Sequence, residues 1–285
     1  MNARNLAAAL LLAFTISMTH AAANTPAAPV AAADVYQQTA ADIREHTGDR
    51  RLLVLGEMHG TREIPLLVRQ LVDDYSRDGT PVLLALEVPT AQTAPMQAYL
   101  NSDGRPEARQ SLSAEPFWSV EDYQHDGRRS RDMLDLIEAL RALKASGRDV
   151  QVMGYDAISD GTDGQQRDDG MARALREAYT ALPANGRLLV LAGNVHAMLK
   201  IPEDAPKEMQ RRPLASQLAD LDAYTVNVSA RSGAFWGCPG RPCRALSVAA
   251  MGGHTGASPR VYDGDDRHWH LGVWLPQFTV ARLVE

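Results

Sequence analysis

The chain has 285 residues, 45% of them hydrophobic, and a formal net charge of −6 at pH 7. This length and apolar content are enough for one large domain, or for one domain with an insertion. Because the net charge is negative and no basic stripe is visible, nucleic acid is excluded from the expected partners.

The N-terminal residues have the pattern of an export signal. A short polar start with Arg4 is followed by an apolar core over 6–18 and by small residues over 19–24. This order predicts a signal peptide over 1–23, and hence a periplasmic or secreted protein. The core is short for a transmembrane helix, so we expect no membrane span after cleavage, with an uncleaved anchor as the alternative. The Ala- and Pro-rich residues 24–33 predict a disordered spacer.

Apolar runs alternate with helical periodicities along the rest of the chain, which we expect to form one domain over 34–285. The predicted strands are 52–55, 80–89, 149–156, 186–192, 223–229, 245–251 and 273–284. The predicted helices are 34–45, 64–72, 129–146, 167–182 and 213–221. Gly147 is placed to end one of these helices. The pattern predicts an α/β fold with a mainly parallel central sheet flanked by helices, and a small lid-like insertion over 90–128.

Polar side chains follow three of the predicted strands, at the point where each strand ends. Glu57 and His59 follow the first, Glu87 ends the second, and Asn194 and His196 follow the fourth. The carboxyl ends of parallel strands meet at one edge of a sheet, where ligands bind in such folds. If the chain stays extended, Glu57 and His59 point to the same side. A lone histidine would more often be a helix cap or a core group. Two matching Gly-x-x-His turns and an aligned Glu favour one functional cleft instead.

Two histidines and two carboxylates support two ways of activating a water. His59, His196 and Glu87 could bind a divalent metal and leave a coordination position open for the water. Alternatively, one histidine oriented by a carboxylate could act as a general base without a metal. The residues alone leave both mechanisms open. The predicted catalytic set is Glu57, His59, Glu87 and His196, and the predicted orienting groups around it are Arg62, Asn194 and Asp156.

Three further motifs give weaker predictions. His268 and His270 would share one side of a strand, but a surface hairpin is the simpler interpretation. The glycine-rich residues 251–256 could hold an anion through backbone N–H groups, or could be a plain loop. The cluster 126–130 could present an arginine to a substrate, or could be a solvated group of charges.

The chain has two cysteines, Cys238 and Cys243, separated by turn-forming residues. In an exported protein this pair predicts a small disulfide loop, since a four-ligand zinc site would need a second pair. The sequence contains no Gly-x-Ser-x-Gly elbow, Walker loop or His-Glu-x-x-His motif. A hydrolase with a serine nucleophile is therefore disfavoured.

Three motifs taken together resemble a known superfamily. They are Leu55-Gly-Glu-Met-His-Gly-Thr-Arg-Glu63, Leu86-Glu-Val-Pro89 and Ala192-Gly-Asn-Val-His196. In this order, across about residues 50–200, they are similar to the erythromycin esterase/ChaN/Tiki (TraB) superfamily, and most similar to ChaN-like domain proteins. The resemblance implies an α/β sheet in which both Gly-x-x-His turns and the Glu surround one cleft.

What the resemblance implies for activity differs between branches of the superfamily. In the esterase branch, His59 would be the base for water attack on a lactone, and Glu57 and Glu87 would be the carboxylates. In the Tiki branch, His59 and His196 would hold a metal for peptide hydrolysis. In the ChaN branch the protein would bind haem. The candidate haem ligands are the histidines, Tyr123 and Tyr155.

The chain departs from each branch. Its Glu-to-His spacing is one residue shorter than is usual in the esterases, and it lacks the cysteine that would carry a ChaN lipid anchor. We expect an exported hydrolase that activates a water for ester or peptide cleavage in a Glu/His cleft, with or without a metal, acting on a small molecule or peptide. The competing expectation is a periplasmic haem- or metal-binding protein without turnover.

Overall fold

The computed structural model describes residues 32–121, 125–156, 163–238, 242–248, 260–263 and 268–284. These residues belong to one compact unit. The predicted signal peptide and the predicted spacer up to residue 31 lie outside them. No helix within the described ranges is long and apolar enough to cross a membrane.

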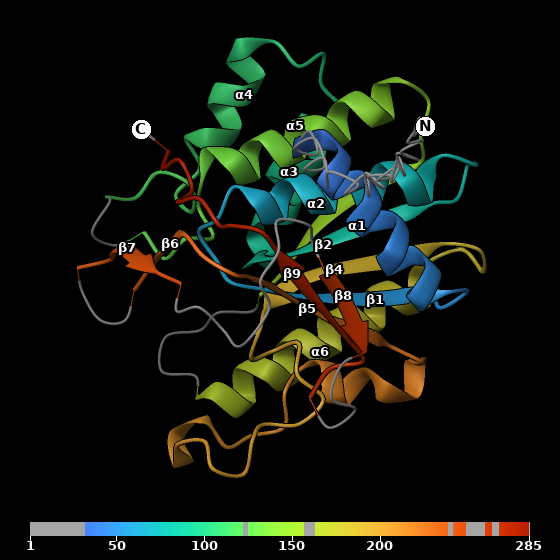
Figure 1. Cartoon of the computed structure of the whole chain (residues 1–285). Helices are drawn as coiled ribbons and strands as arrows, with labels where there is room; N and C mark the ends of the chain where they lie inside the picture. Colours follow the sequence, from blue (N-terminus) through green and yellow to red (C-terminus); the bar gives the residue numbers. More distant parts are fainter. Residues whose placement is uncertain are drawn as a thin grey trace, which may run out of the picture. The chain divides into compact units, whose positions relative to one another are not determined.

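Helices and strands alternate over most of this unit (Figure 1). The α-helices are α1 (Ala32–Thr47), α2 (Glu63–Ser76), α3 (Thr93–Leu100), α4 (Pro106–Ser113), α5 (Arg131–Ala145) and α6 (Gly164–Ala181). The strands are β1 (Leu52–Glu57), β2 (Val82–Pro89), β3 (Val150–Asp156), β4 (Arg187–Gly193), β5 (Tyr224–Ala230), β6 (Ala234–Gly237), β7 (Arg244–Ser247), β8 (Arg260–Asp263) and β9 (Leu271–Leu275). The 3-10 helices are η1 (Thr90–Gln92), η3 (Lys207–Met209) and η4 (Ala215–Leu221).

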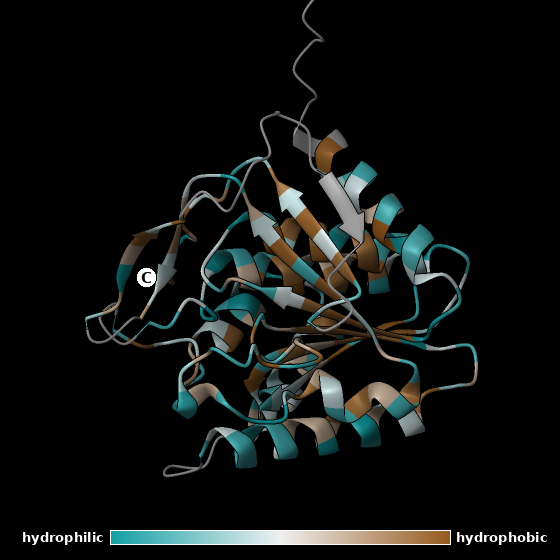
Figure 2. Cartoon of the chain, turned by 60° about the horizontal axis from the view of Figure 1, so that its bottom comes forward, coloured by the Kyte–Doolittle hydropathy of each residue, from teal (hydrophilic) through white to brown (hydrophobic). Residues whose placement is uncertain are grey.

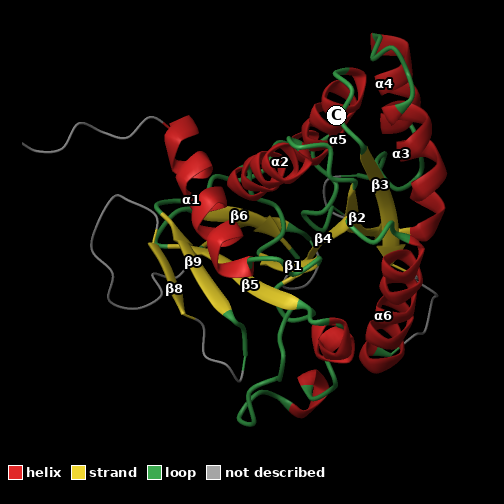
Figure 3. Ribbon diagram, turned by 90° about the vertical axis from the view of Figure 1, so that its right-hand side faces the viewer, coloured by secondary structure: helices red, strands yellow, loops and turns green. Residues whose placement is uncertain are grey.

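A seven-stranded sheet forms the centre, in the order β3-β2-β4-β1-β5-β9-β8. Its neighbouring strands are parallel, except that β8 runs antiparallel to β9. Strand β1 lies between β4 and β5, so the chain passes to both sides of it. Helices α2 and α5 cover one face of the sheet and α6 covers the other (Figure 3). The predicted fold class, a mainly parallel α/β sheet flanked by helices, is confirmed.

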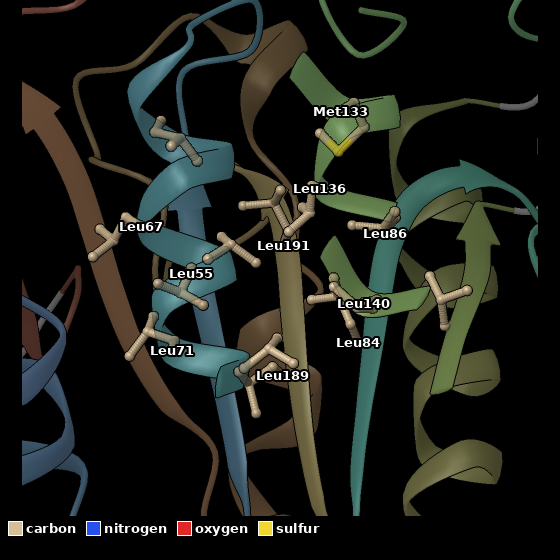
Figure 4. Packing of buried hydrophobic residues seen from close by; sticks show 14 of the residues in the cluster. Leu55, Leu67, Leu71, Leu84, Leu86, Met133, Leu136, Leu140, Leu189 and Leu191 are labelled. Carbon is tan, nitrogen blue, oxygen red and sulfur yellow. The ribbon is translucent and has the colours of Figure 1, made fainter. Parts of the chain in front are cut away.

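The apolar run at the start of β1 is continuous because both faces of the strand are buried. Leu53 and Leu55 belong to the core on the α2 and α5 side, whereas Leu52 and Val54 belong to the core on the α6 side. In Figure 4, leucines of α2 and α5 lie over leucines of β1, β2 and β4. The strands are largely apolar, while the helices carry both polar and apolar residues (Figure 2). The sheet therefore separates two apolar cores and contributes side chains to both.

Local signals in the sequence set the bounds of the two long central helices. The Ser130 hydroxyl caps α5 by accepting the N–H of Met133 at 3.1 Å. Gly147, with a φ of 93°, follows the end of α5 as predicted, because glycine adopts this left-handed conformation at little cost. The Asp163 carboxylate caps α6 by accepting the N–H of Gln166 at 2.7 Å. These caps satisfy backbone donors that a helix start leaves open.

The C-terminal part differs from the prediction. The segment 245–251 does not finish the central sheet in its described part, because β7 pairs antiparallel with β6 in a separate two-stranded sheet. A disulfide between Cys238 and Cys243 closes this hairpin and favours the local pairing. The strand predicted over 273–284 ends at Leu275, where Pro276 follows and cannot donate to the sheet. The helix predicted over 213–221 is the 3-10 helix η4.

The insertion after β2 is helical over much of its length. It contains η1, α3 and α4, and α3 packs against β3 and α5. The Gln97 side chain donates to the Val152 carbonyl at 2.8 Å, which fastens α3 to the edge strand. At the other end of the insertion, Arg128 contacts Glu87 and Asp156. The segment therefore covers a sheet edge and also delivers an arginine to the carboxyl ends of β2 and β3.

Two neighbouring leucines on α2 test this account of the core. Leu67 is fully buried, whereas Leu66 is 43% exposed. We expect Leu67→Ala to lower the free energy of unfolding by about 2–5 kcal/mol, because it leaves a cavity, and Leu66→Ala to change it by less than about 1 kcal/mol. Chemical denaturation followed by circular dichroism would measure both. Equal losses from the two variants would contradict the packing.

Candidate active site

The carboxyl ends of four neighbouring strands bring the predicted polar side chains together. Glu57 ends β1, Glu87 lies near the end of β2, Asp156 ends β3, and His196 follows β4. All of these residues are buried. The side chain of His59 is 25% exposed, so solvent or a ligand can reach it. The gathering predicted from parallel strand ends is therefore present in the fold.

Glu57 and His59 form a hydrogen-bonded pair. Their side chains point to the same side, and His59 Nδ1 lies 2.8 Å from Glu57 Oε1. Because an ionised carboxylate only accepts, this bond places a proton on Nδ1 and leaves Nε2 as the basic atom of the neutral ring. Nε2 lies 3.8 Å from Glu87 Oε1. A Cβ atom added to Gly193 would lie 3.0 Å from Nε2, so a glycine at this position keeps the imidazole uncrowded.

His196 also has a carboxylate partner, but its second nitrogen is occupied. Nδ1 bonds to Asp168 Oδ1 at 2.5 Å, and Nε2 lies 3.0 Å from Arg167 Nη1. A guanidinium can only donate, so Nε2 must accept, and the ring is neutral with its proton on Nδ1. His59 and His196 therefore differ in kind: only His59 has its basic nitrogen free of an arginine donor.

Glu87 is a buried anion held by several donors. Oε2 accepts the Gly193 N–H at 2.6 Å and Oε1 accepts from Arg167 Nη2 at 2.6 Å. Burial alone would raise the pKa of Glu87, but nearby positive charges, among them those of Arg128 and Arg167, hold that pKa below its usual value. Glu87 therefore stays ionised and acts as a fixed negative charge beside His59.

Two arginines join Glu87 to Asp156. Arg128 Nη1 and Arg167 Nη2 donate to Asp156 Oδ2 at 2.8 and 2.7 Å. Arg128 also donates to Asp126 at 2.6 Å, and its positive charge lowers the pKa of Asp126 to about 2 although burial opposes the shift. Within the charged cluster over 126–130, Arg128 is therefore largely buried and is a partner of the buried carboxylates.

The two remaining residues expected to orient the site lie differently. Asn194 is beside the pair, and its backbone N–H donates to the Glu57 carbonyl at 2.9 Å. Arg62 lies outside the cluster, because its guanidinium donates to the Val280 carbonyl at 3.1 Å. The arginines that contact the buried carboxylates are Arg128 and Arg167 instead of Arg62. The sequence offers the cluster 126–130, which contains Arg128, as one of its weaker candidates, but it gives no spacing signal that selects Arg167 in the first turn of α6.

Sequence reasoning also missed Asp168 and Arg211. Asp168 is fully buried and accepts from Arg211 Nε at 2.5 Å as well as from His196. It is one of two aspartates in the polar first half of α6, which offered no reason to choose it. Arg211 lies in an irregular segment after η3, and only the fold shows that it approaches the site.

The other candidates from the sequence lie elsewhere. Tyr155 is fully buried and its hydroxyl donates to the Leu191 carbonyl at 2.9 Å, so it does not present a haem ligand. His270 accepts the Thr225 N–H at 3.0 Å. His268 contacts the Lys200 carbonyl at 2.9 Å. Tyr123 and the residues 251–256 lie outside the described part of the chain.

The charges around His59 make it a stronger base than a free histidine. Burial would lower the pKa of His59, but the negative charges of Glu57 and Glu87 outweigh burial and raise it above the usual value of about 6.5. The neutral form of His59, which can accept a proton, therefore grows as the pH rises through a pKa that lies above the usual value.

A pocket of about 570 Å³ opens over this pair. One part of its lining is polar and comes from the strand ends, including Glu57, His59 and His196. Another part is apolar and comes from the β6–β7 hairpin: Phe235, Trp236 and Leu246. Arg211 lines it as well. A small molecule that entered this pocket would meet two imidazoles, the carboxylates of Glu57 and Asp126, and an apolar surface.

The predicted metal ligands do not fit a metal ion in this arrangement. His59, His196 and Glu87 face one another, yet the His196 Nε2 lone pair accepts from Arg167, and the same guanidinium holds Glu87 Oε1. Metal ligands need free lone pairs. Across the described ranges, no group of three or more His, Cys, Asp or Glu side chains could hold a metal ion.

Comparison with known proteins shows the fold. No protein-family model matches the chain and no curated protein does. Among solved structures, a succinoglycan biosynthesis protein matches with a TM-score of 0.66 at 10% identity, covering 89% of this chain and 98% of the other. The erythromycin esterase EreC, in its open conformation, matches with a TM-score of 0.64 at 13% identity, covering 86% and 95%.

ChaN of Campylobacter jejuni, described with cofacial haem binding, matches with a TM-score of 0.43 at 13% identity, covering 67% of this chain and 85% of that one. This match is too weak to carry an argument. The first two matches show that the chain has an erythromycin esterase-like fold, which the sequence motifs implied. At such low identity they show the fold alone, and function must be argued from the site.

The Glu57–His59 pair makes a prediction for titration. Because the Glu57 charge raises the pKa of His59, Glu57→Gln should lower that pKa, whereas Asp220→Asn, an exposed carboxylate paired with Arg176, should leave it in place. NMR titration of the histidine ring protons would follow both variants. An unchanged His59 pKa in Glu57→Gln would contradict the pairing.

Two arginines on α6 test the role of the buried charges. Arg167→Met leaves Glu87 and Asp156 short of a partner, so we expect the free energy of unfolding to fall by about 3–5 kcal/mol. Arg176→Met removes a surface ion pair with Asp220 and should have little effect. Urea denaturation measures both losses, and equal stability of the two variants would show that the buried network is not needed.

Proposed function

We propose that the protein is a hydrolase in which His59, oriented by Glu57, activates a water to cleave an ester. The observation that carries this proposal is the free Nε2 of His59, held by the 2.8 Å bond of Nδ1 to Glu57 and exposed to the pocket. A carboxylate that holds an imidazole in one tautomer, with the other nitrogen open to a substrate, is the arrangement of a general base.

In the reaction, the attacking water gives its proton to His59 Nε2 as its oxygen bonds to the ester carbonyl carbon. The imidazolium that forms is stabilised by the charges of Glu57 and Glu87. The carbonyl oxygen gains negative charge, and Arg211, which lines the pocket, supplies a positive charge. His59 then returns the proton to the alcohol as the carbon–oxygen bond breaks, which leaves a carboxylic acid and a neutral base.

An ester suits this site better than a peptide. An alcohol leaves with less acid assistance than an amine does, and Glu87, whose pKa is lowered, stays ionised and cannot supply a second proton. The mechanism uses no metal, because an arginine occupies the nitrogen and oxygen that would have to bind it. We also propose that the chain is exported, which the Cys238–Cys243 disulfide supports.

Two histidine variants test the proposal with a panel of small esters. His59→Ala should reduce kcat by about 10²–10⁴-fold because the general base is lost. His268→Ala, which changes a half-buried histidine in the turn before β9, should keep wild-type rates. Circular dichroism would show that both variants are folded.

Wild-type turnover in His59→Ala would overturn the proposal. Absence of turnover in the wild type, together with a haem absorption band in the purified protein, would favour the binding-protein alternative instead. Di- and tripeptides in the same panel would show whether amide bonds are also cleaved.

A further inference from the structure

We infer that Phe235 and Leu246 of the β6–β7 hairpin form a binding surface, here called the wall, for an apolar group of the substrate. The favoured esters would then carry an aromatic or branched aliphatic group beside the scissile carbonyl. This inference rests on the proposed hydrolysis and adds a substrate class to it. It comes from the apolar residues that line the pocket together with His59.

The wall is a small patch of accessible apolar side chains. Phe235 and Leu246 are cross-strand partners, so they stand side by side on one face of the hairpin. Both line the pocket and both are half-buried. Met58, which lies between Glu57 and His59 in the chain, lines the same pocket. Apolar side chains that remain accessible inside a pocket are the surface on which an apolar ligand group gains binding energy.

The wall is fixed to the turn that carries His59. The Trp236 N–H donates to the Gly60 carbonyl at 2.9 Å, and a Cβ at Gly60 would lie 2.1 Å from the Trp236 carbonyl oxygen. Only glycine permits this approach, and the φ of 76° at Gly60 also favours it. The Trp236 indole N–H donates to the His125 carbonyl at 2.7 Å. Backbone and indole contacts thus set the position of the wall relative to the base.

The hairpin is also closed at its turn, between the end of β6 and the start of β7. A two-stranded sheet of four-residue strands is marginal by itself, and the Cys238–Cys243 disulfide ties its strands together. Phe235 additionally packs against the main core. The wall is therefore a preformed surface, and a preformed surface loses little entropy when a ligand binds.

This arrangement predicts which part of an ester meets which part of the pocket. We place the group attached to the acyl carbon against Phe235 and Leu246, because these residues line the same pocket as His59, whose Nε2 the carbonyl has to approach. An acetyl group is too small to cover the wall, whereas a phenylacetyl group can. The preference should appear mainly in KM, because contact with the wall is made equally in the bound substrate and in the transition state.

The test compares ethyl phenylacetate with ethyl acetate. In the wild type, kcat/KM should be at least about tenfold higher for the phenylacetate, chiefly through a lower KM. Leu246→Ser should raise KM for ethyl phenylacetate by about tenfold and so reduce the ratio of kcat/KM for ethyl phenylacetate to that for ethyl acetate. Leu246→Met, which keeps an apolar side chain, should retain the preference and shows that the hairpin tolerates substitution. Leu66→Ala, on the exposed face of α2, should behave as the wild type.

Benzyl methyl ketone resembles ethyl phenylacetate but cannot be hydrolysed. Its binding therefore tests the wall separately from the proposed ester hydrolysis. Calorimetry should show binding that weakens about tenfold in Leu246→Ser. If the wild type cleaves ethyl phenylacetate and ethyl acetate equally well, and Leu246→Ser does not change ketone binding, the inference about the wall is wrong. The proposed hydrolase function would not be affected by that result. Leu246-dependent ketone binding without any ester cleavage would support the wall and overturn the proposed hydrolysis.

Discussion

Charge compensation at one edge of the sheet is the constraint on which the site depends. The ends of β2 and β3 bury Glu87 and Asp156, and a buried carboxylate without a partner is costly. Arg128 and Arg167 meet that need from two separate segments, the end of the insertion and the start of α6. These segments are thereby tied to the strand ends. The same guanidinium groups decide which nitrogen and oxygen atoms near the pocket remain available for chemistry.

This constraint makes the two similar histidine turns different. Both follow a buried strand and both histidines bond to a carboxylate, yet Arg167 occupies His196 Nε2 and leaves His59 Nε2 open. His196 then serves as a neutral link between Asp168 and Arg167, and so helps to hold the arginine on Glu87. His59 gains a raised pKa from the negative charges beside it. One turn therefore helps to build the site, and in the proposed mechanism the other performs its chemistry.

The sequence predicts the architecture well because strand and helix signals are local. Buried runs such as 52–55 and 186–192, and helix ends such as Gly147, depend on neighbouring residues alone. The residues at strand ends were also predictable, since parallel strands share an edge. Arg167 and Asp168 were not, and Arg128 was only one member of a weaker candidate cluster, because the role of each depends on long-range approach between segments. The strand predicted over 245–251 was assigned to the wrong sheet for the same reason, since its pattern does not show that β7 pairs with β6, a strand that the sequence analysis did not predict.

The proposed mechanism requires that His59 activates water without a metal. The most direct test is the rate of ester hydrolysis by the mature protein before and after exhaustive metal removal with a chelator, with metal content measured by elemental analysis. We expect the same rate in both samples, because Arg167 already occupies His196 Nε2 and Glu87 Oε1. Loss of activity on chelation, restored by a stoichiometric divalent metal, would contradict it.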